Sequence, residues 1–253
     1  MIGRVVCALA LIASASPAEA QNAILFFPRF DFRMGADHLS GDDARFVWDA
    51  NFGGEMDFVD YGRGRMTFAA NYEAVLGEQF RRFDVNQGNY LLDYSTSLRV
   101  HGVEVAALFH HMSRHLSDRF KRDPVDWNMF GARVRHAASR GAMQIRTQGD
   151  VLGVLLKSNV DYNWEANGGV SIRVPLRPRI SAISAGSARL VGVDGTRQRH
   201  GTQHGARGEA GLRFEGQGGA VELIVTAERR IDPYPLENTA MSWFSAGFRF
   251  VSR

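Results

Sequence analysis

Apolar and polar side chains alternate along the chain in short segments that recur from residue 24 to residue 252. The segment "MTFAANYEA" (66–74) places Met66 and Phe68 on one face of an extended chain, and Thr67 and Glu73 on the other. A period of two is typical of β-strands that have one apolar face. No segment carries a sustained apolar stripe with the helical period, so we expect an all-β protein.

Twelve segments of the chain follow this alternation and are separated by links of unequal length, although ten or fourteen strands also fit the pattern. We expect short links, such as 101–102 and 138–141, at the same end of the molecule as both termini, and longer links at the other end. The link 52–63 is long for its position, and the pattern offers no account of it. The predicted strands are 24–34, 44–51, 64–75, 89–100, 103–113, 127–137, 142–164, 169–180, 186–193, 205–214, 219–229 and 239–252.

A soluble exported β-sandwich and a membrane barrel both show such alternation, and two features favour the barrel. Aromatic side chains lie near the ends of the apolar faces, as in an interfacial girdle, and full charges recur on the opposite faces, as in a wet or salt-bridged lumen. We therefore expect a single transmembrane, antiparallel, up-and-down β-barrel in the bacterial outer membrane. The charged residues are Arg99, Glu104, Arg133, Glu222 and Arg249. The expected interfacial anchors are Trp48, Trp127, Trp164 and Trp243.

The first twenty residues have the pattern of a secretory signal peptide. Arg4 precedes an apolar run, and Ala18 and Ala20 form a small-residue cleavage signature. The run is shorter than the ~20 residues that a membrane-spanning helix needs. We therefore expect a signal peptide at 1–20 and one barrel domain at 21–253. The only cysteine lies in the signal, so the exported chain offers no thiol for a disulfide, a zinc site or a nucleophile.

Arginine dominates the basic residues, because 28 arginines stand beside only Lys121 and Lys157, with a formal net charge of +3. The planar guanidinium suits phosphate and carboxylate partners. We expect no nucleic-acid partner for an exported protein, whereas outer-membrane lipid or lipopolysaccharide fits this composition. The alternative use of most arginines is pairing with acidic side chains inside a polar lumen.

On two neighbouring predicted strands, the apolar face carries polar side chains near one end. In the strand 103–113, parity places His111 and Ser113 on the apolar, lipid-facing side. In the next strand, Asp126 and Asn128 fall on the apolar face in the same way. An imidazole two residues from a hydroxyl can take its proton, and a partner on the paired strand can fix the imidazole tautomer. This arrangement predicts a serine hydrolase site on the outer wall.

Other uses of the same region stay open. A hydroxyl or amide without a partner in apolar surroundings costs roughly 2–7 kcal/mol, so mutual hydrogen bonding in a structural polar rim also accounts for the cluster. His110 faces inward by parity, and His115 follows in the predicted loop, so a His110–His115 metal pair is a further alternative. The carboxylates of Asp118, Asp123 and Asp126 offer the oxygen ligands that calcium prefers.

The hairpin resembles that of outer-membrane phospholipase A, through "HxS" near a strand end, "WN" opening the next strand, and Arg133 five residues after the asparagine. The resemblance implies a twelve-stranded, calcium-dependent barrel that is active as a dimer. It assigns His111 as the base, Ser113 as the nucleophile and Asn128 as the orienting amide. The outer-membrane lipid A 3-O-deacylases also show His-x-Ser, with a glutamate on the next strand, and Asp126 takes that position here.

The chain departs from both families directly after the serine. Both families have asparagine and a small residue there, and this chain has Arg114 and His115. The string "HxSRHLSD" also resembles an uncharacterised group of bacterial outer-membrane proteins with His-x-Ser-x-His-Leu-Gly-Asp. We expect an outer-membrane lipid acyl hydrolase of the phospholipase A or lipid A deacylase type. The alternative is a non-catalytic barrel, either a narrow pore or an envelope structural protein.

Overall fold

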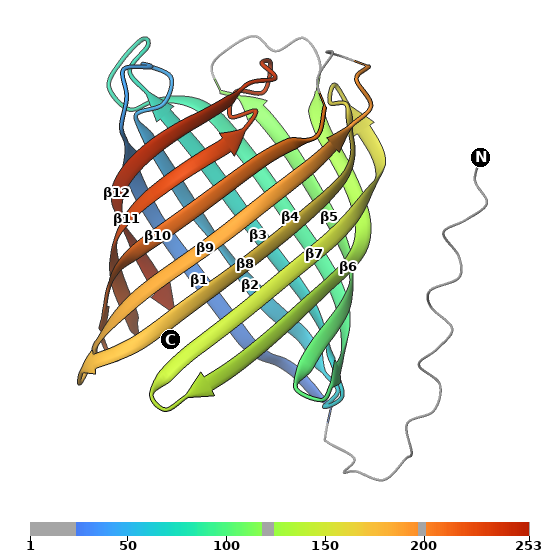
Figure 1. The fold of residues 1–253 in the computed structure, drawn as a ribbon, viewed down its shortest axis with the longest axis vertical. Helices are drawn as coiled ribbons and strands as arrows, with labels where there is room; N and C mark the ends of the chain where they lie inside the picture. Colours follow the sequence, from blue (N-terminus) through green and yellow to red (C-terminus); the bar gives the residue numbers. More distant parts are fainter. Residues whose placement is uncertain (1–23, 118–123, 197–200, 253) are drawn as a thin grey trace.

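The computed structural model describes residues 24–117, 124–196 and 201–252, which form a closed barrel of antiparallel strands (Figure 1). Each strand pairs with its neighbours in the chain, and the first strand pairs with the last. This confirms the all-β, up-and-down barrel and the count of twelve. The strands are β1 (Leu25–Leu39), β2 (Trp48–Asp60), β3 (Arg65–Gly77), β4 (Asp84–Val100), β5 (Val103–Leu116), β6 (Val125–Arg140), β7 (Met143–Ser158), β8 (Tyr162–Arg177), β9 (Ile180–Val193), β10 (Gln203–Glu215), β11 (Gly219–Ile231) and β12 (Ala240–Ser252).

The two ends of the barrel differ in the length of their links. β1 begins and β12 ends at the end that carries the short turns, here called the turn end (Figure 1). In the turn at 101–102, His101 and Gly102 both have positive φ angles, 49° and 80°, which suits a two-residue hairpin loop. The opposite end, here called the loop end, carries the longer links, as predicted, together with one short link at 159–161. The longer links are 40–47, 78–83, 117–124, 194–202 and 232–239.

Several predicted boundaries were wrong. The turn between β8 and β9 is 178–179, inside the predicted strand 169–180, and β9 begins at Ile180 instead of residue 186. β2 continues to Asp60, so the link predicted at 52–63 is a turn of only four residues, 61–64. The acidic residues of this stretch alternate along β2, and Glu55 and Asp57 point into the lumen. The segment 142–164 is also not one strand, since β7 ends at Ser158 and β8 begins at Tyr162.

The expected signal peptide, residues 1–20, lies outside the described residues. Within those residues, no helix has the length and apolar character needed to cross a bilayer.

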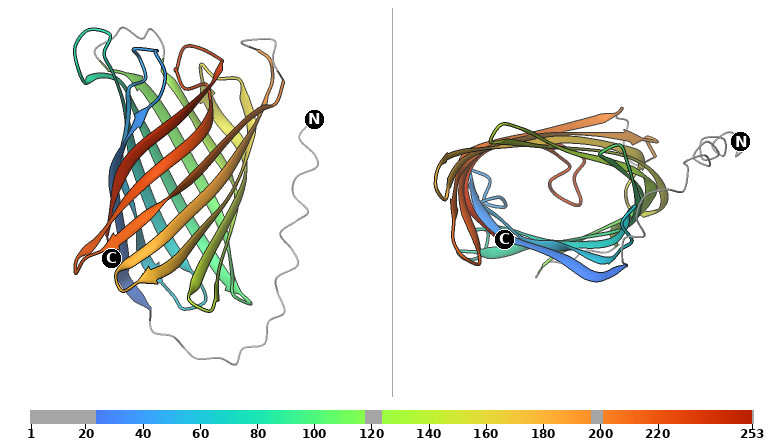
Figure 2. Two further views of the ribbon diagram at one scale, coloured as in Figure 1. Left: turned by 60° about the vertical axis from the view of Figure 1, so that its left-hand side comes forward. Right: turned by 90° about the horizontal axis from the view of Figure 1, so that it is seen from below.

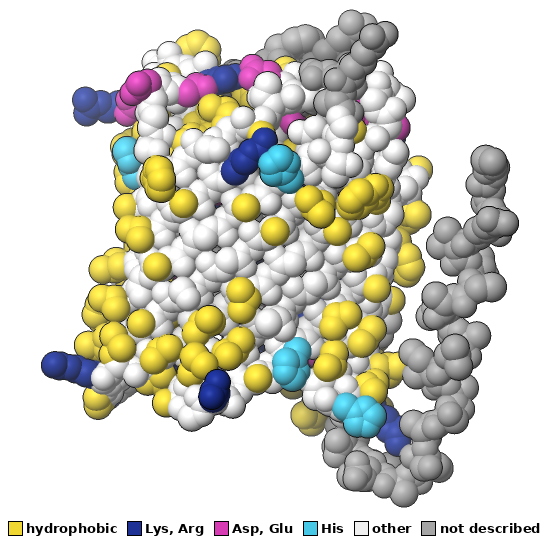
Figure 3. Space-filling view, in the orientation of Figure 1, with side chains coloured by type: hydrophobic (Ala, Val, Ile, Leu, Met, Phe, Trp, Pro, Cys, Tyr) yellow, Lys and Arg dark blue, Asp and Glu magenta, His cyan; other side chains and the backbone are white. Residues whose placement is uncertain are grey.

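Large apolar side chains stand exposed on the outer wall, which is the reverse of a water-soluble protein. In the space-filling view, apolar atoms are spread over the wall and most of the visible charged groups lie near the two ends (Figure 3). An apolar outer band with polar ends is the surface that a bilayer requires of a barrel. Exposed examples from around the wall are Phe30, Phe52, Tyr94, Val151, Leu223, Phe244 and Phe250.

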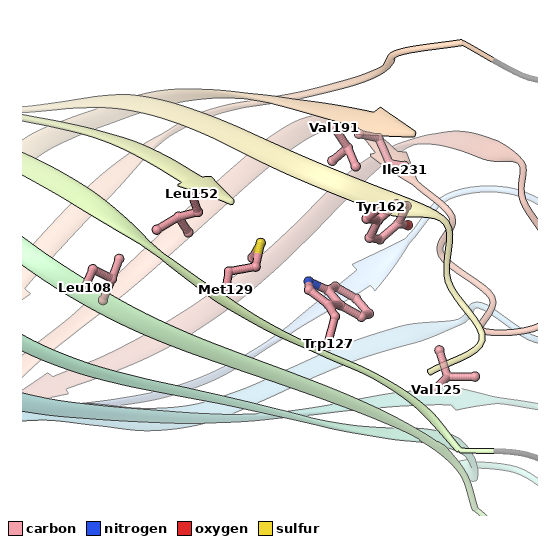
Figure 4. Packing of buried hydrophobic residues seen from close by; sticks show 8 residues of the cluster. All are labelled: Leu108, Val125, Trp127, Met129, Leu152, Tyr162, Val191 and Ile231. Atoms are coloured by element: carbon pink, nitrogen blue, oxygen red, sulfur yellow. The ribbon is translucent and has the colours of Figure 1, made fainter. Parts of the chain in front are cut away.

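The prediction of interfacial anchors was wrong for two of the four tryptophans. Trp127 and Trp243 are only 2% and 6% exposed. Trp127 lies between the outward Asp126 and Asn128, so strand parity turns it into the lumen. There it packs edge-on against Tyr162 of β8, with ring centroids 5.1 Å apart, in a small apolar cluster (Figure 4). Apolar packing inside the barrel is therefore confined to small clusters.

Ion pairs fill much of the lumen. Arg133 on β6 reaches both Asp93 (2.9 Å) on β4 and Asp150 (2.8 Å) on β7. Nearer the turn end, Arg65 reaches Asp57 and Glu104, each at 3.0 Å. Charged groups therefore link neighbouring and nearby strands across the lumen surface, and this pairing accounts for many of the arginines noted in the sequence.

The seam between β1 and β12 depends on a glycine. The α-carbon of Gly247 faces the carboxylate of Asp37 and the backbone carbonyl of Ala36 so closely that no side chain fits. We expect Gly247→Val to destabilise the closed barrel by about 1–3 kcal/mol, since overpacking forces the backbones apart. The measurement is the folded fraction after refolding into lipid vesicles, read from heat-modifiable gel migration.

Gly208 provides the matched control for this substitution, because a β-carbon there meets nothing within 4 Å. Gly208→Val should fold as the wild type does. Equal folded fractions for the Gly247→Val and wild-type proteins would show that the seam tolerates the added side chain.

Candidate functional site

Polar side chains gather on the outer wall where β5 and β6 approach the loop end. His111, Ser113 and His115 alternate along the outer face of β5, and Asp126 and Asn128 lie on the outer face of β6. The register pairs His111 with Asn128 and Ser113 with Asp126. The structure thus brings together the four residues singled out by strand parity.

His111 and Asn128 form a hydrogen bond across the two strands. The distance between His111 Nδ1 and Asn128 Oδ1 is 2.9 Å, and both side chains are half-buried. With the amide oxygen accepting, Nδ1 carries the ring proton and Nε2 keeps its lone pair. Asn128 therefore holds His111 in the tautomer that can act as a base.

Ser113 contacts His115, which the sequence pattern places in the loop after the strand. β5 extends to Leu116, so His115 lies on the strand and shares the outer face of Ser113. The Ser113 hydroxyl lies 2.8 Å from His115 Nε2. His111 and His115 flank Ser113 at equal spacing along the outer face of β5. Continuing the alternation by two residues would have identified His115.

Arg114, between Ser113 and His115, is not part of the outer site. Arg114 turns into the lumen, where it donates to the backbone carbonyls of Asp232 and Pro233. Of the two departures from the families noted above, only His115 therefore brings a new side chain to the outer face.

His110 is separated from this cluster by the wall itself. It is buried on the lumen side of β5, with Nδ1 2.6 Å from Asp93 Oδ1. The inward orientation expected from parity is confirmed. Because His110 and His115 lie on opposite faces of one strand, the alternative of a metal pair between them was wrong.

Of the three aspartates expected to bind calcium, one lies among the described residues. Asp118 and Asp123 lie outside the described residues. Asp126 is half-buried opposite Ser113. Across the described ranges there is no group of three or more histidine, cysteine, aspartate or glutamate side chains that could hold a metal ion.

An apolar hollow of about 510 Å³ lies beside the polar cluster, on the outer face of β1–β4. Gly54 places no side chain on the outer face here, and aromatic side chains surround this position. Tyr90, at one edge of the hollow, is the register partner of Ser113 and lies 5.5 Å from the His115 ring. The hollow thus adjoins the hydroxyl. Its main lining side chains are Phe30, Phe32, Phe52, Met56, Phe68, Tyr72, Tyr90 and Leu92.

Comparison with known proteins identifies the fold. No family model and no curated protein matches the chain. Among solved structures, an outer membrane channel from Pseudomonas putida F1 is similar, with a TM-score of 0.56, 10% identity, and coverage of 94% of this chain and 99% of that one. The outer membrane phospholipase A of Escherichia coli is similar with a TM-score of 0.54, 12% identity, and coverage of 89% and 94%.

A third similar structure is the Salmonella typhi outer membrane phospholipase, in a dimer with bound calcium. Its TM-score is 0.53 and its identity 11%, with coverage of 88% of this chain and 90% of that one. At such identities the likeness concerns the fold. The closed barrel, its apolar outer wall and these neighbours define an outer-membrane β-barrel. Enzymes and channels both occur among proteins of this shape.

Proposed function

We propose that the protein is an outer-membrane lipid acyl hydrolase that acts on a phospholipid or on lipid A from the outer wall of the barrel. The observation that carries the proposal is the His111–Asn128 hydrogen bond, 2.9 Å long, two residues from Ser113 on the lipid-facing side. Lipid ester groups lie at the membrane interface, which is the depth expected of the loop end of the outer wall. A substrate dissolved in water would not reach this face, because lipid covers it.

The proposed reaction uses three side chains. The Ser113 hydroxyl turns from His115 toward His111 and attacks the ester carbonyl, while His111 Nε2 takes the hydroxyl proton. The bond to the alcohol breaks, the leaving oxygen receives that proton, and the acyl group stays on Ser113. Water then attacks the acyl-serine with His111 again as the base, releasing a fatty acid and restoring the hydroxyl. Asn128 keeps the imidazole oriented throughout.

The surroundings of the cluster support a lipid substrate. The apolar hollow on β1–β4 begins beside Ser113 and offers room for hydrocarbon in contact with the membrane. Two of the structural neighbours are phospholipases, one of them a dimer with bound calcium. A homodimer and a calcium requirement are therefore part of the proposal, although no step above depends on the ion.

The proposal predicts that Ser113→Ala abolishes fatty-acid release. Purified protein is assayed on phospholipid and on lipid A in mixed micelles, with calcium and with a chelator. The matched control is Ser242→Ala, which removes an exposed hydroxyl at the loop end of β12, away from the cluster. The control should retain wild-type activity.

Retention of full activity by the Ser113 variant would overturn the assignment. A wild-type protein that releases no fatty acid from either lipid, with calcium or without it, would overturn the hydrolase proposal altogether.

A second candidate is a non-catalytic narrow pore, favoured by a cavity of about 560 Å³ in the lumen. Single-channel recording in planar bilayers distinguishes the two. A pore gives discrete conductance steps that Ser113→Ala leaves unchanged, and a hydrolase gives fatty acid.

A further inference from the structure

The cavity in the lumen opens toward the loop end and lies partly beneath a link between strands. The link 232–239, between β11 and β12, lies inside the outline of the barrel when the molecule is viewed along its axis (Figure 2). Arg114 from β5 holds the carbonyls of this link, and the Tyr162 hydroxyl from β8 donates to Asp232 at 2.6 Å. Residues of β5, of β8 and of this link thus meet beside the cavity at the loop end.

Most arginines that line this cavity already have carboxylate partners. Arg207 pairs with Asp37 and Glu228, each at 3.0 Å. Arg249 pairs with Glu209 at 2.9 Å. These groups are neutralised by the protein itself and have little charge left for a solute.

Arg114 and Arg229, which also line the cavity, donate to backbone carbonyls, whereas Arg33 differs from all of these arginines. It faces the lumen from the middle of β1, lines the cavity and stays accessible to water within it. Across the described ranges it makes no ion pair and no side-chain hydrogen bond. Its electrostatic neighbours include two further cations, Arg207 and Arg249, together with Glu209 and Glu55. Both of these acids bind other arginines.

A second donor lacks a partner in the same cavity. The Nε group of Arg189, on β9, is buried and has no hydrogen-bond partner within the described residues, while its terminal nitrogen binds Glu165. A buried donor without an acceptor costs about 1–3 kcal/mol, so an acceptor from outside the chain would be stabilised here. The Arg33 guanidinium and the Arg189 Nε–H group would each bind a negatively charged oxygen.

We propose that this cavity binds a small oxyanion, a carboxylate or a phosphate, on the guanidinium of Arg33. The guanidinium presents parallel N–H donors that match two oxygens of such a group, and hydrogen bonds between charged groups are stronger than neutral ones. A volume of about 560 Å³ accommodates a small organic anion. This site lies in the lumen and is separate from the outer-wall site at Ser113.

Calorimetric titration of the detergent-solubilised protein tests the proposal. The probes are inorganic phosphate and succinate, which separate the two sources of the oxyanion, with choline chloride as a cationic control. We expect the wild type to bind at least one of the two anions and not choline. Arg33→Gln should weaken that binding tenfold or more, and Arg33→Lys, which keeps the charge but loses the paired donors, should weaken it less.

Two further variants make the result specific. Arg140→Gln removes an exposed arginine at the turn end of β6 and should bind as the wild type does. Ser113→Ala should also bind normally, so loss of lipase activity and loss of anion binding are separable. Heat-modifiable gel migration confirms that each variant is folded. Absence of binding of both anions by the wild type, or equal binding by folded Arg33→Gln, would overturn the proposal.

Discussion

Replacing His111 by alanine should lower the rate of fatty-acid release by about 10³-fold, because the base that takes the Ser113 proton is lost. His111 is assigned this role because its imidazole is held by a partner on the next strand, Asn128 Oδ1 at 2.9 Å. The rate is kcat on phospholipid in mixed micelles. Asn128→Ala should cause a smaller loss, about 10-fold to 10²-fold, since the imidazole remains but is free to turn.

His115→Ala is the internal comparison for this prediction. Its imidazole holds the Ser113 hydroxyl at 2.8 Å, so its removal should change kcat by less than about tenfold. If His115→Ala abolished activity and His111→Ala did not, the base would be His115, and the assignment of His111 would be wrong.

Replacing Arg133 by glutamine should destabilise the barrel by roughly 3–5 kcal/mol, because two buried carboxylates lose their common cation. Asp93 and Asp150 are 7% and 5% exposed and lie on strands to either side of β6. Lumen water and His110 offset only part of the loss, since His110 contacts Asp93 alone. The measurement is the free energy of unfolding in denaturant, from protein folded into lipid vesicles.

A double variant separates charge pairing from general damage to the lumen. Adding Asp150→Asn to Arg133→Gln removes one of the uncompensated charges, so part of the lost stability should return. If the double variant were less stable than the single one by the full cost of a second substitution, packing and not pairing would explain the effect.

Strand number and orientation could be predicted because the physical requirement on a membrane barrel is simple. Lipid outside and charge inside impose a period of two, so the outward positions of His111 and Asn128 follow from parity alone. The boundaries could not be predicted in the same way. Glu55 and Asp57 have the composition of a loop, and only their pairing with arginines from other strands explains why β2 continues through them.

The candidate site shows a second limit of sequence reasoning. Parity gives the face on which Ser113 lies, but it does not give the rotamer of the hydroxyl, which decides between His111 and His115. Trp127 illustrates the same point at the level of residue type. An amphipathic aromatic residue suggested an interfacial position, whereas its place between two outward residues required it to point inward.

The seam that Gly247 permits also bears on the order in which the protein folds. β1 and β12 are aligned over seven residue pairs, against thirteen for β11 and β12, and the seam joins Phe32 to Ser252, which are 220 residues apart in the chain. Hairpins close quickly because their strands are neighbours, whereas this contact requires the last strand to be complete. Until then both edges of the sheet offer unpaired backbone groups, so the chain needs protection from self-association throughout export.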